Sequence, residues 1–292
     1  MATGPGRVAA RAKLNLFLHV TGRRGDGCHT LSSLVVRLDL ADRLRLAPAA
    51  ADRLRLLGPF ACALAGEAEA GNLALRAVRA ARELAGGGPP LAVSIDKQLP
   101  VAAGLGGGSA DAAAALAAAA KLFGARAGGT AFEAAAAALG ADVPACLRSG
   151  PVAVSGIGDM VVPAPPLPSF ALVLVNPRVR LATAEVFRAF AGPFSDAMPL
   201  ERSPAGPAAL AAELALRRND LEAPATRLVP EIGEALAMLA AASGVLLARM
   251  SGSGATCFGI VADLGAAESV AASLRRQRPD WWIAATRTAR SR

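Results

Sequence analysis

A run of glycines placed directly before a run of alanines is the feature that most restricts how this chain can fold. Residues 100–115 read PVAAGLGGGSADAAAA, with glycine at four of the five positions from 104 to 108. Glycine loses more conformational entropy on folding than any other residue, whereas alanine is the best helix former. The stretch therefore predicts a loop over 98–108 and a helix over 109–123. We infer that something in the fold requires the bare backbone of the loop.

A glycine loop in front of a helix can bind an anion. The first amide groups of a helix have no partner within it, and they lie at the positive end of the helix dipole. Glycine lets phosphate oxygens approach these amides closely. We therefore expect a phosphate-binding loop, with Ser109 either capping the helix or donating to a phosphate or a bound magnesium ion. The alternative is a flexible linker that leads into a capped helix.

The loop matches neither of two common nucleotide-binding signatures. A Walker A loop needs GK[ST], which does not follow here, and the Rossmann fingerprint needs GxGxxG in a tight turn between strand and helix. Here the pattern ends in Ser109, and about ten residues separate the helix from the strand expected over 91–96. Asp111 suits the positive end of the helix dipole, but it would repel any phosphate that it faced.

The overall charge fits an anionic ligand. The 292 residues include 31 Lys and Arg against 23 Asp and Glu, a formal net charge of +8. Nucleotides and nucleic acids are both anionic, so a basic nucleic-acid-binding protein is a competing hypothesis. However, the basic residues are spread along the chain, and aromatic residues make up only 4% of it, which leaves few platforms for stacking bases. We therefore expect small-molecule partners and no nucleic acid.

The sequence gives no sign of a membrane or secretory location. The stretch 101–120 is interrupted by Asp111 and holds few large apolar side chains, so we expect no transmembrane helix and no membrane partner. The apolar stretch near the N-terminus is short for a signal peptide, and the four cysteines form no CxxC pair. No ligand cluster surrounds either histidine. We expect a cytoplasmic protein with reduced thiols and no metal centre of its own, and the sequence leaves its oligomeric state open.

Hydrophobic periodicity predicts most of the regular elements. Alternation indicates strands over 12–20, 34–46 and 53–56, with arginines on the wet face of the last two, and Asn72 is placed to cap a helix that ends at Leu84. Further helices are expected over 131–139, 183–190, 208–217, 230–242 and 265–276. Further strands are expected over 91–96, 170–175, 245–250, 256–262 and 283–288.

The prolines of 151–169 indicate a domain boundary near 150–168. We therefore expect two domains, 1–155 and 156–292. The second is expected to be α+β, with a mostly antiparallel sheet.

Three polar residues stand at positions that need an explanation. Lys13 and Asn15 lie on one face of the first strand, where a charge requires either an exposed face or a partner. Asp142 precedes Pro144 by two residues, so it could cap a short helix or act as a base. The second glycine-rich segment, 250–259, is explained adequately by a tight turn between two strands.

Six segments, taken in their order and spacing, narrow the interpretation. They are AKLNLFL, GDGCHTL, LPVAAGLGGGSADAAAAL, GADVPACL, SGIGD and MSGSGATCF, and they span about residues 10–262. The set resembles the GHMP small-molecule kinases, and among them the branch that acts on a cytidine diphosphate alcohol in non-mevalonate isoprenoid precursor synthesis. The glycine loop alone is generic to the family, whereas its combination with the early AKxNL and DGxH is much narrower.

The resemblance implies an architecture and a reaction. The architecture is α+β with two domains: an N-terminal ribosomal-protein-like βαβ domain that binds ATP, and a C-terminal ferredoxin-like domain, with the active cleft between them. The reaction is ATP- and Mg²⁺-dependent phosphorylation of the 2-hydroxyl of 4-(cytidine 5'-diphospho)-2-C-methyl-D-erythritol. A homoserine or mevalonate-type kinase of the same family is the nearest alternative.

The resemblance also implies roles for individual residues. Lys13 and Asp142 would be the catalytic pair, with Asp142 accepting the hydroxyl proton and Lys13 offsetting charge on the transferred group. The residues expected to bind ATP, the first two near its adenine, are Asn72, Lys97, Pro100, Gly104, Leu105, Gly106, Gly107, Gly108 and Ser109. The residues expected to bind the acceptor are Asn15, Cys28, His29, Thr183 and Phe187. No protein ligand of magnesium is assigned.

One departure from the family pattern affects the cytidine site. The family's DGYH carries a tyrosine that stacks on cytosine, whereas this chain has Cys28 at that position and contains no tyrosine. Phe187 matches the family's second stacking aromatic. Loss of one stacking face would cost about 1–3 kcal/mol of base binding if nothing replaces it.

Overall fold

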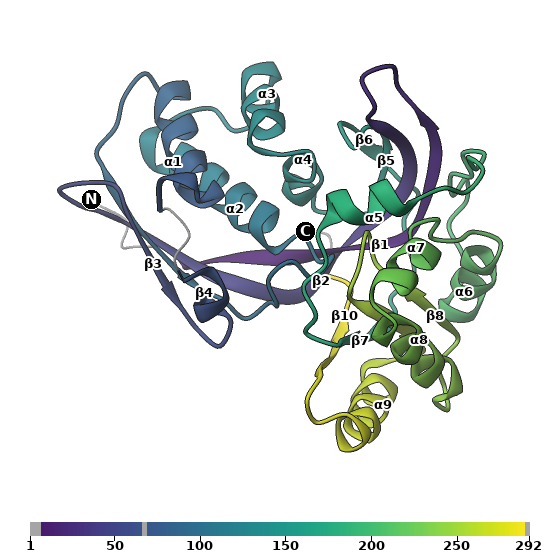
Figure 1. The fold of residues 1–292 in the computed structure, drawn as a ribbon. Helices are drawn as coiled ribbons and strands as arrows, with labels where there is room; N and C mark the ends of the chain where they lie inside the picture. The colour runs from purple at the N-terminus through teal and green to yellow at the C-terminus, as the bar shows by residue number, and fades with distance from the viewer. Residues whose placement is uncertain (1–6, 66–68, 290–292) are drawn as a thin grey trace. The chain divides into compact units, whose positions relative to one another are not determined.

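The chain forms two compact units, each assembled from separate stretches of sequence (Figure 1). The computed structural model describes residues 7–65 and 69–289. Unit 1 comprises residues 1–12, 40–101 and 106–148, and unit 2 comprises 13–39, 102–105 and 149–292. The glycine-rich segment is thus divided, because its residues 102–105 belong to unit 2, whereas those before 102 and from 106 onward belong to unit 1. The boundary expected at 155/156 stays a prediction.

The sheet of unit 1 has one apolar and one basic face. Strand β4 (Leu91–Asp96) pairs antiparallel with residues 43–48 of β2 (His29–Pro48) and parallel with β3 (Arg53–Leu57). Strand β1 (Arg7–Arg23) also pairs with β2. The core face carries Leu44, Leu46, Leu91, Val93 and Ile95, and the opposite face exposes Arg43, Arg45, Arg53 and Arg55. The predicted alternation is confirmed, although β2 runs further in both directions than expected.

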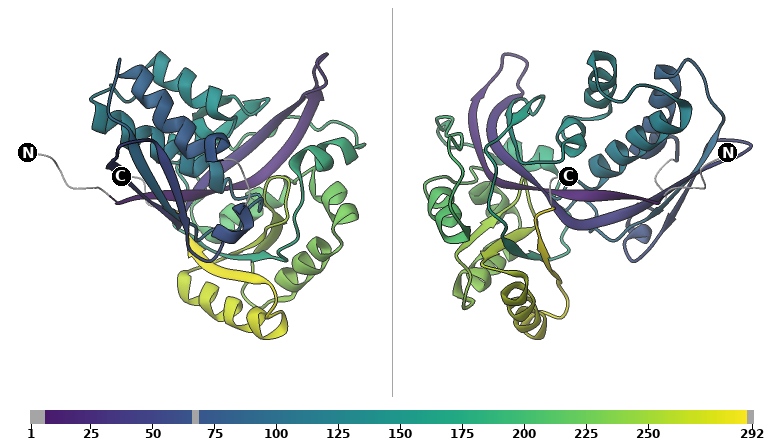
Figure 2. Two further views of the ribbon diagram at one scale, coloured as in Figure 1. Left: turned by 60° about the vertical axis from the view of Figure 1, so that its left-hand side comes forward. Right: turned by 180° about the vertical axis from the view of Figure 1, so that it is seen from behind.

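Helices cover the apolar face of this sheet. They are α1 (Leu73–Leu84), α2 (Gly107–Phe123), α3 (Thr130–Leu139) and the short α4 (Val143–Leu147), with the 3-10 turns η1 (Ala61–Leu64) and η2 (Glu69–Gly71). Helices α1 and α2 lie side by side in each view of Figures 1 and 2. Alanines at their contact leave little side chain between the two backbones. The predicted Asn72 cap is confirmed, because its Oδ1 accepts from the amide of Ala74.

Unit 2 contains an antiparallel sheet with the strand order β10-β7-β9-β8. The strands are β7 (Ala171–Asn176), β8 (Leu247–Met250), β9 (Cys257–Val261) and β10 (Trp282–Arg287). Every residue of β7 is buried, which explains why its sequence is continuously apolar. Helix α9 (Leu264–Gln277) packs on β10 and β7, and α8 (Glu231–Ala241) packs on β8 and β9 (Figure 2). The expected α+β fold with a mostly antiparallel sheet is confirmed.

Three elements of unit 2 were not predicted. Residues 31–35 of β2 pair with β5 (Val152–Gly156), which pairs with β6 (Met160–Pro163), so two strands lie in the stretch interpreted as a boundary. Helix α7 (Glu222–Leu228) adds to α5 (Thr183–Ala189) and α6 (Pro207–Ala215), which were expected. Short strands next to prolines give a weak periodic signal, and this explains the first omission. Among the described residues, no helix is both long and apolar enough to cross a membrane.

Candidate functional site

The start of α2 has no capping side chain. The helix begins at Gly107, two residues earlier than predicted, with Gly106 at the cap position and no capping side chain. Ser109 therefore lies within the first turn and does not cap the helix. The amide of Ala110 donates to the carbonyl oxygen of Gly106 and closes the first helical turn. The amides of the residues before it cannot find carbonyl partners within the helix, so they can bind phosphate oxygens.

A buried ionic cluster lies directly beside this helix start. The Lys97 ammonium contacts Oδ2 of Asp42 and, at 2.7 Å, Oδ2 of Asp111. Burial lowers the pKa of Lys97, but the two carboxylates raise it further than burial lowers it, so the ammonium stays charged. Burial raises the pKa of Asp111 to about 7, against the opposing effect of Lys97. Lys97, expected near the adenine, thus has its ammonium bound to two carboxylates, and its role toward ATP stays a prediction.

Within unit 2, the second glycine-rich segment packs against residues 102–105. The Ser251 hydroxyl donates to the carbonyl oxygen of Gly104 at 3.1 Å, and the amide of Thr256 donates to the carbonyl oxygen of Ala103. Gly104 has φ +72°, and a Cβ there would lie 2.5 Å from the carbonyl oxygen of Ser251. The bare backbone at Gly104 is therefore required by the neighbouring loop, and a phosphate is not needed to explain it.

Lys13 and Asn15 lie on a buried face of β1. Lys13 is 6% exposed and Asn15 is 5% exposed, so the alternative of an exposed strand face is wrong. The Lys13 ammonium donates to Oδ1 of Asn15 at 2.7 Å, and the Asn15 side-chain amide donates to the Ser33 hydroxyl at 2.8 Å. The backbone amide of Asn15 donates to the Ser251 hydroxyl, and that of Lys13 donates to the carbonyl oxygen of Leu105. The Lys13 ammonium is thus bound by Asn15, which Ser33 and Ser251 hold in place.

Asp142 does not act as a helix cap. It occupies the N-cap position of α4, but its side chain makes no capping hydrogen bond, so the capping alternative is wrong. Its backbone carbonyl accepts from the amide of Cys146 and begins the helix. Asp142 belongs to unit 1 and Lys13 to unit 2. Their pairing as catalytic residues stays a prediction.

Aromatic rings gather around His29 in unit 2. The imidazole stacks on the ring of Phe187 with centroids 5.3 Å apart, and it meets Phe190 edge-on at 5.9 Å. Burial, together with the charge of Arg23, lowers the pKa of His29, which favours the neutral imidazole at physiological pH. Cys28 beside it is exposed, and its amide donates to Oδ1 of Asp26.

The remaining predicted residues are placed as follows. Thr183 begins α5, and its hydroxyl shares a 2.8 Å hydrogen bond with that of Ser253. Pro100, which belongs to unit 1, and Leu105, which belongs to unit 2, are both buried. The structure thus brings Lys13 and Asn15 together in one contact and His29 and Phe187 in another.

Four residues that contact the predicted site were missed or left without a role. Ser33 and Ser251 connect to Asn15, and Asp42 and Asp111 hold Lys97. Asp42 carried a usable signal, because it stands in phase with Leu44 and Leu46 on the apolar side of its strand. A carboxylate in that phase requires a buried partner.

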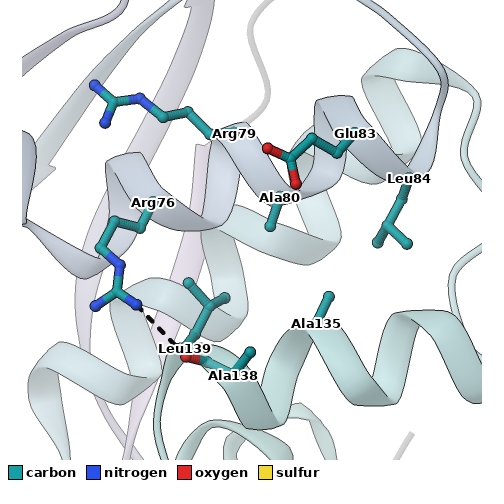
Figure 3. A pocket seen from close by; sticks show the side chains of 8 residues that line it. All are labelled: Arg76, Arg79, Ala80, Glu83, Leu84, Ala135, Ala138 and Leu139. Carbon is teal, nitrogen blue, oxygen red and sulfur yellow. Dashed lines mark hydrogen bonds between the residues drawn. The ribbon is translucent and has the colours of Figure 1, made fainter.

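A separate hollow in unit 1 contains none of the predicted residues (Figure 3). It lies between α1 and α3, has a volume of about 480 Å³, and is lined by Arg76, Arg79, Ala80, Glu83, Leu84, Ala135, Ala138 and Leu139. The Arg76 guanidinium points toward the carbonyl oxygen of Ala138, 3.5 Å away. No polar side chain other than these arginines and Glu83 lines the hollow, so we assign no reaction chemistry to it.

Comparison with known proteins identifies the family. Residues 72–150 match the family model described as the GHMP kinases N terminal domain, and residues 200–280 match the one described as GHMP kinases C terminal. The chain belongs to the GHMP kinase family. A relative from Rhodospirillum rubrum named 4-diphosphocytidyl-2-C-methyl-D-erythritol kinase is 51% identical over 279 residues, which cover 96% of this chain and 91% of the relative. The GHMP assignment was predicted from the six segments and is confirmed.

Solved structures agree with this assignment. A crystal structure of 4-(cytidine 5'-diphospho)-2C-methyl-D-erythritol kinase matches with a TM-score of 0.79 and 34% identity, covering 98% of this chain and all of that one. A homoserine kinase from Cytophaga hutchinsonii matches with a TM-score of 0.72 but only 16% identity, covering 99% and 95% of the two chains. The second match reflects the shared GHMP fold alone. The predicted two-domain α+β GHMP architecture is confirmed.

Proposed function

We propose that this GHMP kinase transfers the γ-phosphoryl group of ATP to the 2-hydroxyl of 4-(cytidine 5'-diphospho)-2-C-methyl-D-erythritol. The observation that carries the proposal is the 51% identity, over almost the whole chain, to a relative that bears the name of this kinase. A homoserine-type acceptor is not favoured, because the homoserine kinase shares only 16% identity with this chain. The cytoplasmic location expected from the sequence stays a prediction.

ATP is proposed to bind with its phosphates at the N-terminus of α2. The absence of a capping side chain there supports this assignment, since the amides from Gly107 to Ser109 need an acceptor. Magnesium is proposed to arrive as the MgATP substrate complex, held mainly by phosphate oxygens. Within 7–65 and 69–289 there is no group of three or more His, Cys, Asp or Glu residues that could hold a metal ion by themselves. This fits magnesium, which commonly uses few protein ligands and several phosphate oxygens and waters.

The proposed catalytic groups are Asp142 and Lys13. Asp142 accepts the proton of the substrate's 2-hydroxyl while the oxygen of that hydroxyl bonds to the γ-phosphorus. The bond between the γ-phosphorus and the β,γ-bridging oxygen breaks at the same time, which releases ADP. The Lys13 ammonium stabilises negative charge that develops on the transferred group. Its hydrogen bond to Asn15 supports this role, because a buried long side chain fixed by a partner need not be ordered again during the reaction.

The acceptor's cytosine is proposed to lie near Phe187 and His29, with Asn15 toward the methylerythritol and Thr183 beside the base. The stacked imidazole and phenyl rings support a flat aromatic ligand here, because a planar ring already packs against Phe187. Cys28 replaces a tyrosine of the family, so this chain contributes less aromatic surface at that position. We therefore expect weaker cytosine stacking than a tyrosine would give.

Acceptor specificity is the experiment that tests the function. The full chain is incubated with MgATP and, separately, the cytidine diphosphate alcohol, homoserine and mevalonate, and ADP release is measured. We expect turnover with the cytidine compound alone. Turnover with homoserine or mevalonate and none with the cytidine compound would overturn the proposal. Salt-dependent nucleic-acid binding without ATP turnover would support the competing hypothesis instead.

The role of Asp142 is tested by Asp142→Asn. Loss of the proton acceptor should lower kcat by about 10²–10⁴-fold, while the affinity for ATP stays within a few-fold of the native value. Single-turnover kinetics and equilibrium binding of an ATP analogue separate these two quantities. Asp52→Asn is the matched control, since Asp52 pairs with Arg82 and is assigned no part in the reaction. A native kcat in Asp142→Asn would exclude the base role.

The cytosine site is tested by Cys28→Tyr. A restored aromatic ring should lower the KM for the cytidine substrate by roughly 3–10-fold, which is the smaller part of a full base-stacking contribution. The KM for ATP should not change, because ATP is assigned to α2. An unchanged KM for the cytidine substrate would mean that the base binds elsewhere.

A further inference from the structure

Three charged side chains meet in the interior of unit 1, directly beside the proposed phosphate site. Asp42 comes from β2, Lys97 follows the last residue of β4, and Asp111 lies in the second turn of α2. They are 0%, 3% and 5% exposed, respectively. We call these three residues the ionic cluster. Buried charges are expensive unless they are paired, so the pairing decides which charge state the fold tolerates.

The two carboxyl groups of the ionic cluster are not equivalent. Asp42 accepts from the backbone amides of Gln98 and Leu99, at 2.6 and 2.9 Å, and from the Lys97 ammonium. Within the described part of the chain, Asp111 accepts from Lys97, its carboxyl also interacts with that of Asp42, and its buried Oδ1 has no hydrogen-bond partner. Hydrogen bonds from donors stabilise the ionised carboxylate, so Asp42 is the ionised member. A proton held by the ionic cluster therefore resides on Asp111.

Charge counting leads to the same assignment. One ammonium between two ionised carboxylates leaves one uncompensated negative charge in a dry interior. Protonation of Asp111 makes the cluster neutral and keeps the Asp42–Lys97 ion pair intact. Burial raises the pKa of Asp111 to about 7, with Lys97 opposing and Asp42 reinforcing the shift, so the proton is exchanged near neutral pH.

The charges that act on Asp111 are those of its own cluster. Helices α1, α3 and α4 pack against α2. The charged residues on them are Arg76, Arg79, Arg82 and Glu83 of α1 and Glu133 of α3, with Asp142 preceding α4. The groups that shift the Asp111 carboxyl are Lys97 and Asp42.

The ionic cluster is tied to the chain on both sides of the glycine loop. Lys97 and the Asp42-bound amides of residues 98 and 99 precede the glycines of the loop, and Asp111 follows them. A Cβ added at Gly107 would lie 3.7 Å from the Lys97 ammonium and 3.8 Å from Oδ2 of Asp42. The ionic cluster therefore lies against the first residue of α2, whose amides are proposed to bind phosphate.

We propose that Asp42 and Lys97 are positioning residues of the nucleotide site and that Asp111 takes up a proton when nucleotide phosphates bind at the start of α2. This inference rests on the proposed function, since it assumes a nucleotide at that helix. Phosphates bring further negative charge close to the ionic cluster. The ionised state of Asp111 is then disfavoured relative to the protonated state, and the carboxyl binds its proton more tightly. By linkage, the nucleotide binds more weakly at a pH where Asp111 is ionised.

Calorimetry with a matched variant tests the proposal. A non-hydrolysable MgATP analogue is titrated into the full native chain and into Asp111→Asn from pH 6 to pH 9, each in two buffers of different ionisation enthalpy. The difference between buffers gives the number of protons taken up per nucleotide bound. Asparagine keeps the shape of the side chain and leaves Asp42 and Lys97 paired. Asp52→Asn is the control, because Asp52 is a carboxylate of the same unit that pairs with Arg82 and Arg79.

The expected results are specific to a proton on Asp111. If phosphate binding raises the affinity of Asp111 for its proton about tenfold, the native chain takes up about half a proton more than Asp111→Asn near pH 7.5. Across pH 6–9, its affinity for the nucleotide falls about tenfold relative to that of the variant. Asp52→Asn should behave as the native chain does. A residue that merely supports the fold would change the affinity equally at every pH.

Each alternative outcome has a distinct meaning. Equal proton uptake and a constant affinity ratio between the native chain and Asp111→Asn would overturn this inference and leave the kinase proposal intact. Failure of the native chain to bind the nucleotide at any pH would overturn the proposed function as well. If Asp111→Asn does not fold, the native chain alone decides. Its uptake is then measured at pH 8, where the nucleotide is fully ionised, and zero uptake there would overturn the inference.

Discussion

Two clusters of buried polar side chains hold the glycine-rich segment. One lies beside the start of α2 and the other beside residues 102–105, and they differ in chemistry. In unit 1, the ionic cluster fixes the start of α2 through opposite charges. In unit 2, residues 102–105 are held by hydroxyl and amide groups, in which Ser251 bonds both Gly104 and the backbone of Asn15. We call Asn15, Ser33 and Ser251 the Asn15 network. The same short segment is thus held by charge on one side and by neutral hydrogen bonds on the other.

The difference determines how each side responds to change. An ionic cluster exchanges a proton, so its strength varies with pH and its burial carries a desolvation cost. Neutral hydroxyl and amide groups do not titrate in the physiological range, so their contribution depends on geometry alone. Removing one partner leaves a buried donor or acceptor unsatisfied, which is costly. Unit 2 should therefore be sensitive to shape, and unit 1 to pH.

The largest effect is expected from Gly104→Ala. A methyl group there would lie 2.5 Å from the carbonyl oxygen of Ser251 and 2.8 Å from that of Gly254, and φ is +72°. Backbone atoms cannot move aside as a flexible side chain can, so strain and overlap add. We expect a loss of about 3–4 kcal/mol in the free energy of unfolding, measured by urea denaturation.

Gly86→Ala is the matched control for this substitution. Gly86 has φ +70°, nearly the same as Gly104, but a Cβ there would meet no atom within 4 Å. It isolates the backbone strain, which should cost about 1 kcal/mol. Equal losses in the two variants would show that packing of the second loop against Gly104 contributes nothing.

A smaller effect is expected from Ser251→Ala. The hydroxyl is fully buried and bonds the carbonyl oxygen of Gly104 and the amide of Asn15, so its removal should cost about 1–3 kcal/mol of stability. Ser33→Ala is the matched comparison, because the buried Ser33 hydroxyl also bonds Asn15 but donates to the carbonyl oxygen of Phe17, whereas that of Ser251 donates to Gly104. The KM for ATP should rise in Ser251→Ala and remain native in Ser33→Ala. A native KM in both would mean that the Asn15 network does not support the nucleotide site.

Much of the fold was predictable because its cores use regular periodicity. Strand β4 was predicted at its observed bounds, since LAVSID alternates between a buried and a half-buried face. Helix α1 was fixed at its start by Asn72 and β7 by a continuous apolar run. Strands β5 and β6 were missed because they lie among prolines and glycines, whose local preference for turns outweighed a short alternating pattern.

The site was predictable in its residue types but less so in its contacts. The glycine loop predicted an anion site, which stays a prediction, and the combined motifs pointed to Lys13 and Asn15, which are in contact in the structure. The link between Asp42 and Lys97 could also have been inferred, because each continues the apolar phase of its strand with a charge. Antiparallel pairing of Arg43 with Asp96 brings the next pair, Asp42 and Lys97, opposite each other.

Other contacts depend on residues that are far apart in sequence. Ser251 and Gly104 are in contact although 147 positions separate them, and no local sequence pattern indicates a contact at that separation. For the same reason, the sequence attributed the glycine at 104 to phosphate binding, whereas its closest neighbours are backbone carbonyl oxygens. The local sequence shows where glycine leaves the backbone without a side chain. The tertiary structure is needed to identify the atoms that lie close to that backbone.

The effect that most directly separates the two sides is the pH dependence of stability in Asp111→Asn. The pKa of Asp111 is raised in the folded state to about 7, above its usual value in an unfolded chain. Between these two values the folded chain keeps a proton that the unfolded chain loses, so this group reduces stability as pH rises from about 4 to about 7. Asparagine has no such proton.

The stability of Asp111→Asn relative to the native chain should therefore increase between pH 4.5 and pH 8, by on the order of 1–3 kcal/mol. Asp52→Asn should stay nearly constant relative to the native chain over this range and should change, in the opposite direction, only below about pH 4. Its bonds with Arg82 lower the pKa of Asp52, so this carboxylate stabilises the native chain above the acid range and that contribution is lost as pH falls. Ser251→Ala should differ from the native chain by a constant amount at every pH, because the groups it leaves unpaired do not titrate. A pH-independent difference for Asp111→Asn as well would remove the distinction between the ionic cluster and the Asn15 network.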